Sequence, residues 1–121
     1  MEQKALNDAL IKFAKLGMTK EVAKCLELGA EICIYDNSAL RWATYNGHTE
    51  MVKFLLQNGA NIHANDDIAL KWAALYGNIE TVKLLLENGA NVHAEADVAW
   101  KYAADSGHIE ITKLLEKYAK Q

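Results

Sequence analysis

The residues best suited to metal or nucleophile chemistry fall in columns that recur at a constant spacing. His63 and His93 share one column with Cys33, and His48 and His108 share another. A zinc site needs several such ligands within ~2–2.3 Å of one ion. Side chains placed once per stacked unit would lie roughly 10 Å apart, the distance between packed helices. We therefore expect no metal site, and we expect the histidines to hydrogen-bond backbone groups of loops and helix ends.

The remaining reactive residues form no catalytic arrangement. Ser38 and Ser106 are isolated and lack the sequence context of a nucleophile elbow. No glycine-rich phosphate loop is present, and the acidic residues are spread along the chain rather than gathered at one place. Cys25 and Cys33 have no disulfide framework around them, which favours free thiols. The sequence predicts a protein that is not an enzyme and needs no cofactor.

The composition of the chain argues against several further classes of protein. The chain has 121 residues, of which 51% are hydrophobic, and a formal net charge of −3. Basic and acidic residues alternate along it, whereas a nucleic-acid binder normally carries a basic excess on one face. No apolar run reaches the ~18 residues of a membrane span, and the first ten residues lack a signal-peptide pattern. We expect a cytoplasmic protein that binds neither membrane nor nucleic acid.

The elements that carry these residues follow from a repeat. All seven glycines fall into two series with a period of 30, namely Gly17, Gly47, Gly77 and Gly107, and Gly29, Gly59 and Gly89. A period of roughly 20–50 residues is typical of stacked repeat architectures. The sequence predicts a single domain of four repeats, with a capping repeat at each end. Their predicted ranges are 1–30, 31–60, 61–90 and 91–121.

Each repeat is predicted to be a helix–turn–helix unit. Short polar residues form a column before the first helix, where Asn and Asp are favoured as N-caps; they are Asn7, Asn37, Asp67 and Asp97. The mid-repeat glycine ends that helix, because glycine adopts the left-handed conformation of a helix end without steric cost. A second helix follows, for example from Ile79 to Asn88, with Val82, Leu85 and Leu86 on one stripe. Helices this short must pack on their neighbours to persist.

The terminal repeats carry polar residues at stacking positions. Lys12 and Lys24 replace large apolar residues in the first repeat, and Glu116 replaces a leucine in the last. Terminal repeats lack an outer neighbour, so such substitutions are typical of caps. We expect a monomer, with end-to-end stacking of copies as the alternative.

The second half of each repeat resembles a known family. Residues 77–92 read Gly-Asn-Ile-Glu-Thr-Val-Lys-Leu-Leu-Leu-Glu-Asn-Gly-Ala-Asn-Val, similar to the second helix and Gly-Ala exit of an ankyrin repeat. The pattern recurs at 47–62 and less fully at 17–32 and 107–115. The resemblance implies an all-α ankyrin-repeat solenoid of four helix–turn–helix units. Because the period is 30 rather than about 33, the β-hairpin fingers of the family are expected to be shortened or absent. Residues 62–67 and 39–43 resemble the short-loop, tryptophan-bearing repeats of large DNA viruses.

The resemblance implies a protein–protein interaction module that binds a protein partner on the concave helix face. The residues that vary most between repeats lie just before the mid-repeat glycines, where large apolar and aromatic side chains are typical interface anchors. The predicted partner-binding residues are Tyr45, Asn46, Leu75, Tyr76 and Asp105, with Arg41, Lys71 and Asp67 as further polar contacts.

Some alternatives stay open on the sequence alone. The aromatic column Trp42, Trp72 and Tyr102 fits either packing between repeats or a stacking platform for a ligand. The basic column Arg41, Lys71 and Lys101 fits either an ordinary solvated helix face or a ladder for an acidic partner. At the level of function, the alternatives to an interaction module are a specific inhibitor of a host or partner enzyme, of the viral or phage counter-defence type, and an engineered repeat scaffold.

Overall fold

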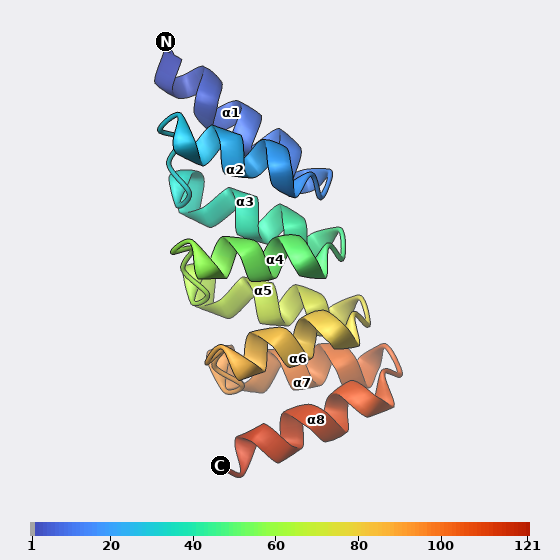
Figure 1. Cartoon of the computed structure of the whole chain (residues 1–121). Coiled ribbons are helices and arrows are strands. Elements are labelled where there is room, and N and C mark those ends of the chain that lie inside the picture. Colours follow the sequence, from blue (N-terminus) through green and yellow to red (C-terminus); the bar gives the residue numbers. More distant parts are fainter. Residues whose placement is uncertain (1) are drawn as a thin grey trace. The chain divides into compact units, whose positions relative to one another are not determined.

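A computed structural model describes residues 2–121, and within that range the chain forms α-helices and no strand. The helices fall into two compact units, Met1–Asn61 and Ile62–Gln121. Figure 1 labels the helices in chain order. The first unit contains α1 (Glu2–Lys15), α2 (Thr19–Glu27), α3 (Ile34–Tyr45) and α4 (Thr49–Gln57). The second unit contains α5 (Ala64–Leu75), α6 (Ile79–Glu87), α7 (Ala94–Asp105) and α8 (Ile109–Ala119). The predicted all-α helix–turn–helix fold without β-hairpin fingers is confirmed.

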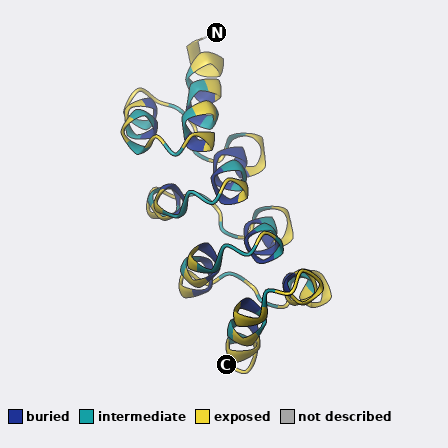
Figure 2. Cartoon of the chain, turned by 90° about the vertical axis from the view of Figure 1, so that its right-hand side faces the viewer, coloured by how far each residue is buried: buried dark blue, intermediate teal, exposed yellow. Residues whose placement is uncertain are grey.

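Each unit has the same internal plan. In the first unit α1 contacts α2 and α3, and α4 contacts α2 and α3. In the second unit α5 contacts α6 and α7, and α8 contacts α6 and α7. Within a unit the buried residues lie on the sides of the helices that face their neighbours (Figure 2). None of the helices in residues 2–121 combines the length and apolarity that a membrane-spanning helix requires.

The core of each repeat pairs small residues on the first helix with branched ones on the second. In the second unit, α5 buries Ala69, Leu70 and Ala73, and α6 buries Val82 and Leu85. Alanines let the helix backbones approach closely, while the branched side chains fill the space between them. This alternation of small and large residues is what interior packing density demands.

The mid-repeat glycines end the first helices, as predicted. At the end of α5, Gly77 has a φ of +75°, and the backbone N–H of Asn78 donates to the carbonyl of Ala73 over 3.0 Å. This six-residue closure is the Schellman motif, which requires a left-handed residue at the position that Gly77 occupies. The chain therefore reverses sharply and sends α6 back along α5.

A left-handed turn takes the place of the family's finger. Residues 35–37, 65–67 and 95–97 all have φ between +49° and +65°, and a right-handed helix begins only after them. For L-residues this conformation costs roughly 1–2 kcal/mol per residue, and Asn and Asp tolerate it best. Six of the nine residues in these turns are Asn or Asp. The shortened repeat thus replaces a hairpin with a single turn of opposite hand.

The Asn/Asp column does not cap the first helices, so that prediction is wrong. Asn7 lies inside α1, and the others lie in the left-handed turns. In three repeats the side-chain oxygen instead accepts the backbone N–H of the residue 24 positions later. The pairs are Asn7 with Glu31 at 2.8 Å, Asn37 with Asn61 at 2.8 Å and Asp67 with Asn91 at 2.7 Å. Each bond ties a first helix, or the turn before it, to the loop that follows the second helix.

The two cysteines lie in different surroundings, which predicts different reactivity. Cys25 is 5% exposed, and burial raises the pKa of its thiol. Cys33 is exposed, and its thiol donates to the carbonyl of Gly59. Because the thiolate is the nucleophile, we expect iodoacetamide at pH 8 to modify Cys33 at least about tenfold faster than Cys25. Peptide mass mapping of timed samples measures both rates. The two rates should converge in denaturant, and equal rates in the folded protein would contradict this assignment.

Candidate functional site

The exposed ends of the first helices form the most distinctive surface of the first unit. The rings of Trp42 and Tyr45 meet edge to face, with centroids 5.6 Å apart and planes at 75°. The Nζ atom of Lys15, at the end of α1, lies 4.1 Å from the centroid of the Trp42 ring. We name this group, together with Asn46, the aromatic patch. It joins two neighbouring repeats through a cation–π contact and an aromatic pair.

Backbone hydrogen bonds hold the aromatic patch in place. The carbonyl of Lys15 accepts the side-chain amide of Asn46 at 3.2 Å and lies 2.8 Å from Nε2 of His48. Two side chains from the turn after α3 therefore grip one carbonyl at the end of α1. This confirms the expected role of His48 in hydrogen-bonding a backbone group. It also means that Tyr45, which is 42% exposed, stands on a fixed base.

The corresponding surface of the second unit is built in a similar way. Nε2 of His108 lies 3.1 Å from the carbonyl of Leu75, so a histidine again bridges the turns of two neighbouring repeats. Tyr76 is 50% exposed, Leu75 is half-buried, and Asp105 is exposed at the end of α7. The predicted anchors of this unit therefore reach the surface beside a turn that is held in place.

The predicted polar contacts have structural partners instead. Arg41 is half-buried, and its guanidinium donates to the carbonyls of Tyr35 and Asp36 at 2.9 and 3.1 Å, closing the left-handed turn. Lys71 is buried and forms an ion pair with Glu95. The basic column therefore does not present a regular series of free positive charges, because Arg41 and Lys71 already have partners within their own units.

Asp67 is also drawn into the interior. Its side chain is 5% exposed, accepts the backbone N–H of Asn91 and lies 3.0 Å from Nδ1 of His63. A buried carboxylate with these partners orders the loop before α7 rather than facing a ligand. The sequence signal for this role was the column of short polar residues, a residue type that is also typical of N-caps.

The remaining histidines pair with carboxylates four residues later, across the left-handed turns. His63 contacts Asp67, and Nδ1 of His93 lies 2.6 Å from Asp97. These carboxylate contacts add to the expected hydrogen bonds with backbone groups, which His48 and His108 make. Across the described residues 2–121, no three His, Cys, Asp or Glu side chains gather in a way that could hold a metal ion.

A comparison with known protein families identifies the same repeats. A family model described as ankyrin repeats in three copies matches residues 2–66 and 64–121. These two ranges cover nearly the whole chain. No curated protein matches the sequence.

Proposed function

Because the chain belongs to the ankyrin-repeat family, whose domains are generally non-catalytic interaction modules, we propose that it binds a protein partner through the exposed ends of its first helices. The aromatic patch is the observation that carries this proposal. It presents Tyr45 on a base fixed by Trp42, Lys15 and Asn46. Pre-organised aromatic side chains are the usual anchors of protein interfaces, because little entropy is lost when they are covered.

The second unit contributes a separate anchor in this proposal. Tyr76 and the half-buried Leu75 flank the Gly77 turn, with the carboxylate of Asp105 exposed at the equivalent place in the next repeat. The unit therefore offers an apolar contact with a single acidic neighbour. Lys71 and Asp67 play no direct part, since both are buried.

Truncating Tyr45 tests the proposal. The immobilised full chain is used to capture partners from an extract of the source cells, and the captured proteins are quantified by mass spectrometry. Loss of an anchor side chain at the centre of an interface costs about 2 kcal/mol or more. We therefore expect Tyr45→Ala to lower the amount of captured partner at least about tenfold, with no change in the melting temperature beyond a few degrees.

The matched control is Tyr35→Ala. Tyr35 is 55% exposed, similar to Tyr45, but it lies in the left-handed turn at the opposite end of α3. Capture should be unchanged in this variant. If Tyr45→Ala captures the same proteins in the same amounts as Tyr35→Ala, the aromatic patch is not the binding surface.

A further inference from the structure

The hydrogen bond between the Asn/Asp column and the following loop recurs in three repeats, but a different bond replaces it in the last repeat. In the three preceding repeats the Asn/Asp column accepts a loop N–H from the residue 24 positions later. In the last repeat the corresponding residue, Gln121, donates its N–H to the carbonyl of Tyr118. The cause is the length of α8, which continues to Ala119, whereas α6 ends at Glu87. The side chain of Asp97 is consequently 52% exposed, against 5% for Asp67.

The carboxylate of Asp97 can still accept a hydrogen bond from a backbone N–H. Its carboxylate lies 2.6 Å from Nδ1 of His93. Asp67 makes the same contact with His63 and still accepts the N–H of Asn91 through its second oxygen. The histidine contact therefore leaves room for a main-chain donor.

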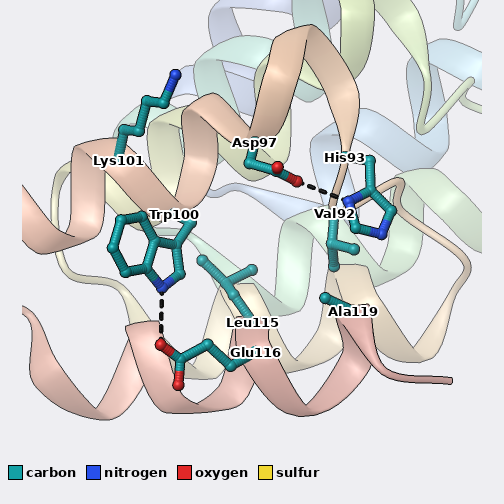
Figure 3. Close-up of a pocket in the computed structure, with 8 residues that line it drawn as sticks. All are labelled: Val92, His93, Asp97, Trp100, Lys101, Leu115, Glu116 and Ala119. Carbon is teal, nitrogen blue, oxygen red and sulfur yellow. Dashed lines mark hydrogen bonds and ion pairs between the residues drawn. The ribbon is translucent and has the colours of Figure 1, made fainter.

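A pocket of about 410 Å³ opens beside this carboxylate (Figure 3). Trp100 stands where Leu70 stands in the preceding repeat, and it is 39% exposed where the leucine is 1% exposed. Its indole Nε1 donates to Glu116 over 3.1 Å. Lys101 also lines the pocket, with its ammonium group directed away from Glu116. The remaining wall is apolar, and it consists of Val92, Leu115 and Ala119.

The preceding repeats indicate which residues could bind in the pocket beside Asp97. The loop residue that donates its N–H is followed each time by a β-branched apolar residue; the pairs are Glu31 with Ile32, Asn61 with Ile62 and Asn91 with Val92. Val92, the last of these branched residues, itself lines the pocket beside Leu115. A ligand that reproduces this pair would therefore repeat the hydrogen bond that Asp67 and Asn91 already make in this unit.

We propose that this pocket is a peptide-binding site for a short segment with a polar residue followed by valine or isoleucine. The N–H of the polar residue donates to Asp97, and the branched side chain enters between Trp100 and Leu115. Pockets of this size hold a few side chains rather than a whole domain. A second copy of the chain is a poor source of the segment, because the N–H groups of Asn61 and Asn91 are already bonded within their own units.

A synthetic peptide tests this assignment. An acetylated, amidated peptide with the sequence of residues 89–94 is titrated into the ¹⁵N-labelled full chain, and the indole N–H signal of Trp100 is followed by NMR. We expect a saturable shift of that signal with a millimolar or lower Kd. The same peptide methylated on the backbone nitrogen of its asparagine should bind at least about tenfold more weakly, because it can no longer donate a hydrogen bond to Asp97.

Variants of the chain sharpen the test. Asp97→Ala should weaken peptide binding at least about tenfold. Asp97→Asn should retain it within about twofold, because Asn7 and Asn37 accept the same kind of donor. Ala119→Phe should abolish binding by filling the pocket. Lys113→Ala is the neutral control, because Lys113 is an exposed residue of α8 that does not line the pocket.

Several results would overturn the proposal. The proposal is wrong if the Trp100 signal does not shift at saturating peptide or if the methylated peptide binds equally well. It is also wrong if peptide binding survives Asp97→Ala or Ala119→Phe. A Trp100 shift that depends on protein concentration without peptide would indicate a second copy as the occupant and would also overturn it.

Discussion

Replacing Gly77 with alanine is expected to lower the free energy of unfolding by about 3 kcal/mol. The residue has a φ of +75°, where an L-side chain costs roughly 1–2 kcal/mol. A Cβ atom there would also lie 2.7 Å from Cε1 of the His108 ring. That ring contacts the carbonyl of Leu75, so moving it away breaks the bridge between two repeats. Strain and overpacking therefore add at one position. Equilibrium denaturation in urea measures the change.

Gly89→Ala is the matched control for Gly77→Ala. Gly89 has a φ of +91°, but a Cβ atom added there would meet no other atom within 4 Å. We expect this variant to lose only about 1 kcal/mol, from backbone strain alone. Adding His108→Ala to Gly77→Ala should recover part of the loss, since the clash is removed. Equal losses at the two glycines, or no coupling with His108, would show that the packed histidine has no role.

The second large effect is expected at Asp67. Asp67→Ala removes the acceptor of the Asn91 N–H and should lower the free energy of unfolding by about 2 kcal/mol, because that N–H loses its partner. Asp67→Asn keeps an acceptor and should lose less than half as much. Urea denaturation again measures both variants.

Asp66→Ala separates hydrogen bonding from backbone conformation at this turn. Asp66 has nearly the same φ as its neighbour, +54° against +58°, but it is exposed. Substitution there should lower the free energy of unfolding by about 1 kcal/mol or less, because alanine tolerates positive φ less well than aspartate. If the two alanine variants lose the same amount, the cost comes from the left-handed turn and not from the bond to Asn91.

The helix ends and the core stripes could be predicted from the sequence because both are local. Glycine at Gly77 is set by backbone geometry, and the spacing of Val82, Leu85 and Leu86 is set by the pitch of one helix. Neither requires knowledge of distant residues. The repeat then multiplies each signal, which is why the fold followed from the sequence alone.

The left-handed turns could not be predicted, because Asn and Asp favour two different structures. Both residues are good N-caps and both tolerate positive φ. A sequence pattern does not distinguish the two. Glu95 and Ala96 also adopt positive φ, although neither residue type favours it. Glu95 forms an ion pair with Lys71 from the preceding repeat, a contact that no local sequence pattern reveals.

The candidate site was only partly accessible to sequence reasoning for the same reason. Tyr45 and Tyr76 are exposed as expected, since they follow the last buried turn of their helices. The burial of Lys71 depends on Glu95 in the next repeat, 24 residues away. A single lysine in a column of basic residues carries no sign of such a partner. The Lys15–Trp42 contact likewise joins two repeats and lies outside any local pattern.

The hydrogen bonds between residues 24 positions apart limit which insertions and deletions the repeats can accept. Each bond closes between residues of fixed separation, so removing or duplicating a full block of 30 residues leaves the separation in every surviving pair intact. A single inserted or deleted codon between Asp67 and Asn91 alters that separation and rotates every later side chain of the helix it enters by about 100°. Length variation among descendants of this sequence should therefore come in whole repeats, with smaller insertions confined to positions outside these paired spans.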